Sequence, residues 1–311
     1  MIKIKDFAAR EKYAQPMLIK SCTKGTTAKG APYLTIVFQD NSGSIDGKFW
    51  DVKPETEENC VVGHVVDTEF EALEYNGNLQ LRVFRVTDIP QDDIDMSEYL
   101  ISGNYAETEL RQKVEELVKS VKNEKMRLLV EAMFRRVGQN FYTYPAASRI
   151  HHGYLGGLAE HTLGMAALAE QVAVLYPSIN RDLLICGILM HDMGKTAELS
   201  GVVASEYTLE GKLAGHISIC HGWLMEAAEE LVLEKEEETL LLRHMILSHH
   251  GKYEFGSPVL PELREAEVLN LIDNLDARMN ILDQAMEKLK PGQWTQKIFA
   301  LENRTFYKPK V

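Results

Sequence analysis

The sequence predicts two domains of different class: an all-β domain over residues 1–90 and an all-α domain over residues 105–311, joined by a linker over residues 91–104. Apolar and polar side chains alternate between short turns in the first domain, whereas apolar positions recur at helical spacing in the second. The intervening stretch is acidic and has few large apolar groups, which is typical of a domain boundary. A length of 311 residues also suits about two domains.

The N-terminal region contains several short stretches with the composition of strands. Residues 33–38 alternate and are rich in β-branched and aromatic side chains. Asn76 and Gly77 form a dipeptide that favours a tight hairpin turn. So many short strands in so few residues indicate a small barrel. We expect the strands at residues 17–20, 33–38, 45–50, 61–70 and 79–86.

Helical spacing dominates the rest of the chain. Leu110, Val114 and Leu117 follow this spacing, and prolines fall between the predicted helices, where helix breakers belong. We expect helices at residues 110–121, 125–138, 158–175, 182–192, 214–233, 236–248 and 262–288.

Composition narrows the class of protein. The net charge of −12 argues against a protein that coats nucleic acid by bulk charge, although a local basic groove remains compatible with it. No apolar run approaches the roughly 20 residues that a membrane helix requires, and the first residues lack the apolar core of a signal peptide. We therefore expect a cytoplasmic protein with no membrane partner, whose four cysteines are reduced.

The most informative motif is His191-Asp192, at the end of the apolar run 183–190. Buried charged residues are costly unless they are paired or bound to a metal. Imidazole and carboxylate together suit a divalent cation of the Mn, Fe, Co or Zn type. In chain order the candidate ligands are His161, His191, Asp192, His216, His249, His250 and Asp273. Asp276 is an alternative to Asp273.

Such a set of ligands suits hydrolysis of a phosphate ester by one or two metal ions, because a divalent cation activates water and neutralises a phosphate oxygen. Asp192 is the candidate bridge between two ions, since a carboxylate has two oxygens. Lys195, one helical turn further, is expected to place its ammonium on a phosphate oxygen. Asp192 and Lys195 are thus the catalytic candidates. Taken singly, each ligand also has a structural alternative, such as helix capping by His249 and His250.

The ordered set of ligands resembles the HD superfamily of metal-dependent phosphohydrolases, which are all-helical. On that resemblance four residues match the core ligands: His161, His191, Asp192 and Asp273. Three match the additional histidines of two-metal members such as the HD-GYP group: His216, His249 and His250. The chain departs from that group at residues 251–258, where the Gly-Tyr-Pro motif is missing, so a cyclic dinucleotide substrate is not expected.

The N-terminal region resembles an OB-fold of the nucleic-acid-binding type, through residues 33–40 with Gly43, Ile45, Phe49 and Trp50. The combination of this barrel with an HD domain, and the sequence of residues 152–162, resembles the bacterial YhaM family of 3′-to-5′ exoribonucleases. That resemblance implies dependence on Mn²⁺ or a similar ion such as Co²⁺, Fe²⁺ or Zn²⁺. It also implies single-stranded RNA as substrate, with DNA left open, and nucleoside 5′-monophosphates as products.

A barrel of this kind binds single strands by stacking bases on aromatic rings and holding phosphates with Lys or Arg. Tyr33 and Tyr75 lie near turns and are the stacking candidates, whereas Phe38, Phe49 and Phe84 are expected in the core. The other candidate substrate contacts are Lys20, Lys24, Lys48, Arg82 and His152.

Two other functions remain open at this stage. One is a phosphodiesterase or nucleotidase for small nucleotides, because an HD domain alone supports that chemistry. The other is a non-catalytic regulator that binds nucleic acid and has a structural metal site, although the candidate ligands outnumber the four that a closed structural site needs. A homo-oligomer is also left open.

Overall fold

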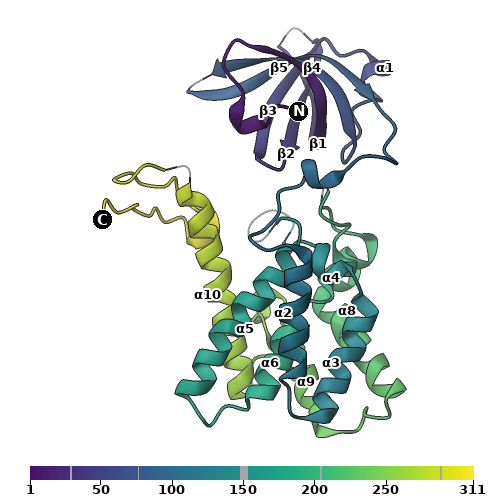
Figure 1. The fold of residues 1–311 in the computed structure, drawn as a ribbon, viewed down its shortest axis with the longest axis vertical. Coiled ribbons are helices and arrows are strands. Elements are labelled where there is room, and N and C mark those ends of the chain that lie inside the picture. The colour runs from purple at the N-terminus through teal and green to yellow at the C-terminus, as the bar shows by residue number, and fades with distance from the viewer. Residues whose placement is uncertain (29, 76, 148–152, 204, 288) are drawn as a thin grey trace. The chain divides into compact units, whose positions relative to one another are not determined.

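The computed structural model describes residues 1–28, 30–75, 77–147, 153–203, 205–287 and 289–311. The chain forms two compact units, of which the first comprises Met1–Ser102 with Val202–Ala204 and the second the remaining residues. Figure 1 shows them as a β barrel and a bundle of helices. A β domain followed by a helical domain is the predicted fold class.

In the described part of the first unit, five strands close into a barrel in the spatial order β1-β2-β3-β5-β4 (Figure 1). Neighbouring strands are antiparallel, except that β3 and β5 run parallel. The bounds are β1 Lys12–Thr26, β2 Pro32–Asp40, β3 Gly43–Trp50, β4 Val65–Tyr75 and β5 Asn78–Asp88, with short helices η1 Ile4–Asp6, α1 Pro54–Glu57 and η2 Met96–Glu98.

Strand β1 is much longer than the predicted residues 17–20. Its first half pairs with β4 and its second half with β2, and the register shifts between Ile19 and Ser21. The polar residues on either side of the apolar centre of β1 belong to the strand because their backbones pair with β4 and β2. Backbone pairing does not require alternating apolar and polar side chains, so the sequence did not reveal the full length of β1. Asn76, in the predicted turn between β4 and β5, lies outside the described residues.

Alternate side chains of the strands fill the barrel. Phe38 and Phe49 are buried, as predicted. The expectation that Phe84 lies in the core is wrong, because 42% of its surface is exposed. Leu81 and Val83 occupy the inward positions of β5, so the alternation directs Phe84 outward.

Part of the acidic stretch that follows the barrel is held against it. The Gln91 amide donates to the carbonyl of Val65 and accepts from its N–H, both at 2.9 Å. The Gln39 amide donates to the carbonyl of Tyr99 at 3.1 Å, and Tyr99 is buried. Residues up to Ser102 therefore belong to the barrel unit, while domain boundaries at residues 90 and 105 remain a prediction.

The second unit is helical. Side chains of Asn123, Asn180 and Thr208 accept a backbone N–H in the first turn of α3, α6 and α8, as helix caps do. The elements are α2 Glu107–Lys119, α3 Glu124–Val137, α4 Asn140–Thr143, α5 Gly157–Leu175, α6 Arg181–Met190, α7 Lys195–Glu198, α8 Leu209–Glu230, α9 Glu237–Ser248, η3 Tyr253–Phe255, α10 Arg264–Glu287 and η4 Phe299–Leu301.

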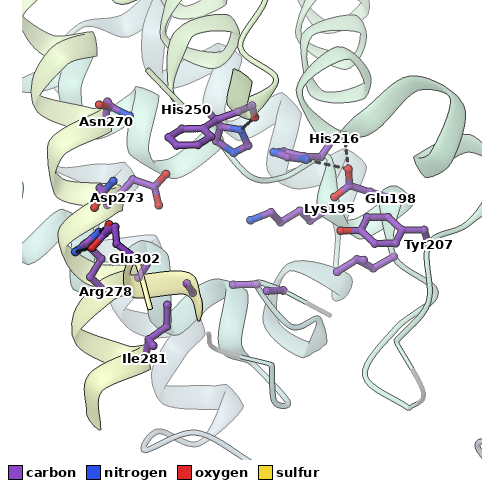
Figure 2. A pocket seen from close by; sticks show the side chains of 17 residues that line it. Lys195, Glu198, Tyr207, His216, His250, Asn270, Asp273, Arg278, Ile281 and Glu302 are labelled. Carbon is purple, nitrogen blue, oxygen red and sulfur yellow. Dashed lines mark hydrogen bonds and ion pairs between the residues drawn. The ribbon is translucent and has the colours of Figure 1, made fainter. Parts of the chain in front are cut away.

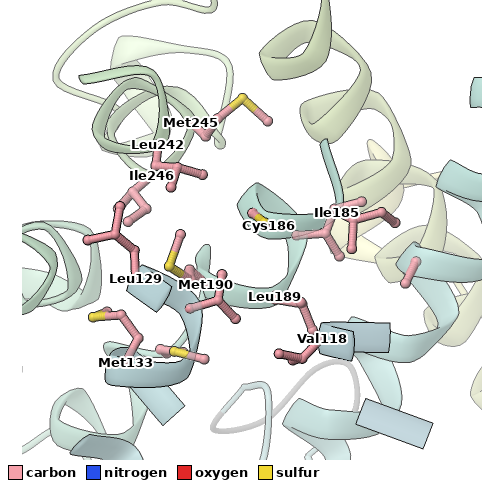
Figure 3. Packing of buried hydrophobic residues seen from close by; sticks show 14 of the residues in the cluster. Val118, Leu129, Met133, Ile185, Cys186, Leu189, Met190, Leu242, Met245 and Ile246 are labelled. Carbon is pink, nitrogen blue, oxygen red and sulfur yellow. The ribbon is translucent and has the colours of Figure 1, made fainter. Parts of the chain in front are cut away.

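Helix α6 is the central element of this bundle. It packs against α3, α5, α9 and α10, and every residue from Leu183 to Met190 is buried. Figure 3 shows Met190 near Leu129 and Met133 of α3. Burying one such side chain stabilises the fold by roughly 1.5–3 kcal/mol, so the position of α6 is strongly determined. The His191-Asp192 doublet follows directly at its C-terminal end.

Among the described residues, no helix is both long and apolar enough to cross a bilayer. The four cysteines are free, with Cys186 and Cys220 buried in the helical unit.

Replacing Asn180 by Ala should lower the free energy of unfolding of the helical unit by about 1 kcal/mol, because the first turn of α6 loses its cap. Urea unfolding followed by circular dichroism measures this change. Gln171→Ala, at an exposed position of α5, is the control and should change stability by less than half as much. Equal stability of the two variants would contradict the cap assignment.

Candidate metal centre

The doublet at the end of α6 lies at the centre of a buried cluster. His191 and Asp192 are 0% and 3% exposed. Residues that are far apart in the sequence converge on them from the surrounding helices: His161 from α5, His216 from α8, His249 and His250 from the end of α9, and Asp273 from α10.

The Asp192 carboxylate connects the members of this cluster. Its Oδ2 lies 3.2 Å from Nε2 of His191 and 3.9 Å from Nε2 of His161. Its Oδ1 lies 3.4 Å from Nε2 of His216 and 3.6 Å from Nε2 of His249. Each oxygen thus faces a different pair of imidazoles.

Two groups of potential ligands result from this arrangement. Within each group the ligand atoms lie within 4.8 Å of one another, and Asp192 belongs to both. Asp273 Oδ1 adds a carboxylate 3.3 Å from Nε2 of His161. The groups are Asp192, His216, His249 and His250, and His161, His191 and Asp192. A carboxylate shared in this way has the geometry of a bridge between two cations.

Several of the inward-facing atoms lack a hydrogen-bond partner among the described residues. They are buried, and they include Nε2 of His191, His216 and His249, and Oδ1 of Asp192. Leaving a buried polar atom unsatisfied costs roughly 1–3 kcal/mol, so several converging on one centre need a common partner. A divalent cation coordinated by nitrogen and oxygen fits this donor set.

The outer nitrogen of each imidazole is tied to a local acceptor. Nδ1 of His191, His249 and His250 donates to a backbone carbonyl at 2.7–2.8 Å. A carbonyl only accepts, so Nδ1 carries a proton, and in the neutral ring Nε2 is then the nitrogen with a lone pair for a metal ion. Such outer partners keep imidazoles in the form that binds metals.

Two carboxylates do the same for the other imidazoles. Asp276 Oδ2 accepts from Nδ1 of His161 at 2.6 Å, on the outer side of the ring, where a carboxylate can orient an imidazole that is a candidate ligand. Glu198 Oε1 accepts from both Nδ1 and the backbone N–H of His216, at 3.0 and 2.9 Å. The sequence contained no signal for Glu198, because an isolated acidic residue in a short polar stretch is ordinary.

Two glycines allow His216 to reach the centre. Gly215 adopts φ +72°, a left-handed conformation that breaks α8 into two limbs and that other residues rarely adopt. A Cβ on Gly194 would lie 2.1 Å from the backbone oxygen of His216, so only glycine permits this close approach. The helix predicted at residues 214–233 begins earlier, at Leu209, because a short helical segment before Gly215 continues across the kink into the rest of α8.

Electrostatics keep Asp192 ionised and favour the neutral form of His249 and His250, whereas they favour the protonated form of His161, whose proton a bound cation would have to displace. Burial alone raises the pKa of Asp192, but Lys195 and His191 beside it hold the pKa well below its usual value. Burial lowers the pKa of His249, and burial together with His249 lowers the pKa of His250 to about 4. Burial also lowers the pKa of His161, but hydrogen bonds to Asp273 and Asp276 outweigh it and raise the pKa to about 9.

A cavity of about 650 Å³ adjoins the cluster, and His216, His250 and Asp273 line it (Figure 2). Lys195 also lines it, with Nζ 2.5 Å from Asp192 Oδ2. The ammonium therefore lies between the proposed bridging carboxylate and the space open to a substrate. Burial lowers the pKa of Lys195, but Asp192 outweighs burial and raises it, so the group is cationic at neutral pH.

The candidate substrate contacts of the barrel are partly brought together. The Tyr33 ring packs against Trp50 at 4.9 Å between centroids, and Lys48 Nζ lies 5.0 Å from the Tyr33 ring. Arg82 pairs with Lys48 across β3 and β5, and its guanidinium lies 5.5 Å from the ring of Phe84. Trp50 and Phe84 are exposed members of this surface that the sequence analysis did not select.

The remaining candidates lie elsewhere. Lys24 forms an ion pair with Glu57 at 2.6 Å, Lys20 is exposed on β1, and Tyr75 is 66% exposed at the end of β4. His152 lies outside the described residues.

A helical bundle that gathers His161, the doublet and Asp273 defines the class of HD-domain proteins, and residues 158–278 match the family model described as HD domain. Across nearly the whole chain, the sequence is also similar to the 3′-5′ exoribonuclease YhaM of Geobacillus sp. (strain WCH70). The two are 44% identical over 294 residues, which cover 94% of this chain and 90% of that protein. This chain therefore belongs to the YhaM family, which confirms the predicted resemblance. No solved structure matches it significantly.

Removing an outer carboxylate should weaken metal binding without removing a ligand. Asp276→Ala and Glu198→Ala should each lower the affinity for Mn²⁺ by about 10-fold to 100-fold, because the imidazole loses the partner that orients it. Isothermal titration calorimetry measures the affinity. Asp283→Asn, at an exposed position of α10, is the control and should bind like the unmodified protein. Unaltered affinity in both alanine variants would rule out the supporting role.

Proposed function

We propose that this chain is a metal-dependent exonuclease that degrades single-stranded RNA from the 3′ end to nucleoside 5′-monophosphates. The similar protein of Geobacillus is named a 3′-5′ exoribonuclease, which supports the reaction and its direction. The observation in this chain that carries the proposal is the Asp192 carboxylate, shared by two groups of ligands beside an open cavity. That arrangement suits two cations acting on one phosphodiester.

The metal ions would be held by His161, His191, Asp192, His216, His249, His250 and Asp273. Divalent ions at this site lower the pKa of water and neutralise charge on a phosphate oxygen. Asp192 stays ionised, burial lowers the pKa of His249, and the Nδ1 contacts of His191 and His249 leave Nε2 of each ring as the atom that would hold an ion. We assign Mn²⁺ as the natural ion, and Co²⁺, Fe²⁺ and Zn²⁺ suit the same nitrogen and oxygen ligands.

Lys195 and Asp192 are the proposed catalytic residues. The ammonium of Lys195 faces the cavity, where it can form an ion pair with a non-bridging oxygen of the bound phosphate. Its present partner, Asp192 Oδ2, would then face a metal ion instead of the ammonium. Lys195 thus adds positive charge to the site as the phosphate becomes more negative in the transition state.

The outer face of the barrel supports a polymer as the substrate. Tyr33 and Trp50 offer neighbouring rings for bases, and Lys48 and Arg82 lie beside rings where they can contact phosphates. An enzyme for mononucleotides would need only the helical unit. Only a contact to the 2′-hydroxyl would distinguish RNA from DNA, and the proposed contacts are to bases and phosphates. The proposal therefore includes single-stranded DNA as a second substrate.

Digestion of a 5′-labelled RNA 20-mer with Mn²⁺ tests the activity. We expect products that shorten stepwise from the 3′ end and mononucleotides as the released species, and a chelator should stop the reaction. Asp192→Asn should lower kcat by roughly 100-fold or more, because the shared ligand loses its charge. Asp283→Asn should match the unmodified protein. Internal fragments as first products, or full activity of Asp192→Asn, would refute the proposal.

Replacing Trp50 by Ala should raise KM on the RNA 20-mer by about 5-fold to 150-fold, because base stacking on one ring contributes roughly 1–3 kcal/mol. Tyr176→Ala, which removes an exposed ring directly after α5, should leave KM unchanged. Steady-state kinetics over a range of RNA concentrations distinguishes the two. A Trp50→Ala protein with unaltered KM would exclude this face of the barrel from substrate binding.

A further inference from the structure

The last residues of the chain differ in composition from the rest. Residues 289–311, called the C-terminal hairpin below, contain five basic side chains and one acidic side chain, whereas the whole chain has a net charge of −12. The match to the HD domain ends at residue 278, so this segment is an addition to that domain. Its basic residues are Lys290, Lys297, Arg304, Lys308 and Lys310.

The segment is an antiparallel hairpin, drawn in yellow beyond α10 in Figure 1. Bridges join Trp294 to Tyr307 and Ile298 to Arg304. Backbone hydrogen bonds run from Thr295 N–H to the carbonyl of Phe306 at 2.9 Å, and from Lys308 N–H to that of Gln293 at 2.8 Å. The hairpin therefore presents its side chains in defined directions.

The hairpin is attached to α10 and reaches the cavity beside the metal centre. Arg278 of α10 donates to both oxygens of Glu302, at 2.8 and 3.1 Å, and this contact lowers the pKa of Glu302 to about 2. Lys308 Nζ donates to the carbonyl of Met286 in α10 and to that of Leu289 in the hairpin itself, both at 2.8 Å. Ala300 and Glu302 line the cavity, and Figure 2 shows Glu302 beside Arg278.

Large aromatic rings are exposed on this basic segment. Trp294 and Phe299 are 62% and 86% exposed, and Tyr307 is 40% exposed beside Trp294. Neighbouring exposed rings commonly mark a binding surface. Among the described residues no ion pair neutralises the exposed Lys290, Lys297 or Lys310.

We propose that the C-terminal hairpin is a second binding surface for single-stranded nucleic acid, which leads the strand into the adjoining cavity. Trp294 and Phe299 stack on bases, and Lys290, Lys297 and Lys310 contact phosphates. The inference rests on the proposed function, because that function identifies the bound polymer as a nucleic acid. A polyanion complements the positive charge of the hairpin, and the hairpin is continuous with the cavity that accommodates a phosphodiester.

Binding of a fluorescent RNA 20-mer, measured by anisotropy in the Asp192→Asn protein so that the strand stays intact, tests the inference. Trp294→Ala and Phe299→Ala should each weaken binding by about 5-fold to 150-fold. Replacing Lys290, Lys297 and Lys310 together by Gln should reduce the slope of log affinity against log salt by about 2, since each phosphate contact contributes about 0.7. Tyr176→Ala and Lys235→Gln are the matched exposed controls and should bind normally.

Phe299→Ala keeps the test decisive if Trp294→Ala loosens the hairpin, because the Phe299 side chain is almost fully exposed. Unchanged affinity in Phe299→Ala together with an unchanged salt slope in the lysine variant would overturn the inference. A second result would also overturn it. If the hairpin variants bind RNA normally but sedimentation shows that they have lost a dimer, the hairpin is an interface between two copies of the chain. An unmodified protein that cleaves no RNA refutes the proposed function, whereas loss of binding in the hairpin variants still supports the second surface.

Discussion

The helical unit is organised around one buried carboxylate. Asp192 is almost fully buried, and a charged group in that position is tolerated only if opposite charges and hydrogen-bond donors surround it. Lys195 and the imidazoles of four elements supply that environment, and the apolar helix α6 sets the position of the carboxylate. The cluster therefore depends on the packing of α6 as much as on the ligands themselves.

The same constraint explains the layer of residues outside the ligands. An imidazole binds a metal ion only with one nitrogen free of a proton, and the acceptor at the other nitrogen decides which one. Backbone carbonyls at helix ends fulfil this role for His191, His249 and His250, whereas Asp276 and Glu198 fulfil it for His161 and His216. The kink at Gly215 belongs to the same design, since it directs His216 towards Asp192.

An acidic protein that acts on a polyanion needs its positive charge in particular places. Here cationic side chains lie beside rings on the outer face of the barrel, and the C-terminal hairpin contains both basic residues and exposed rings. Lys195 is a third location of positive charge, inside the cavity. Surfaces of this kind would offer stacking and phosphate contacts without a net positive charge on the whole chain.

The sequence by itself determined the division into a β and a helical domain, the buried helix before the doublet, and the set of residues that converge around Asp192. These features depend on local periodicity and on residue chemistry, which are written in the order of the amino acids. Only the tertiary structure decided that β1 pairs with two neighbours, that Phe84 faces outward and that Asp276 supports His161. It alone also revealed Glu198 beside His216, and Glu302 at the cavity. Such roles depend on partners distant in the sequence, and an isolated carboxylate or ring has the same local pattern whether it faces solvent, a histidine or a cavity.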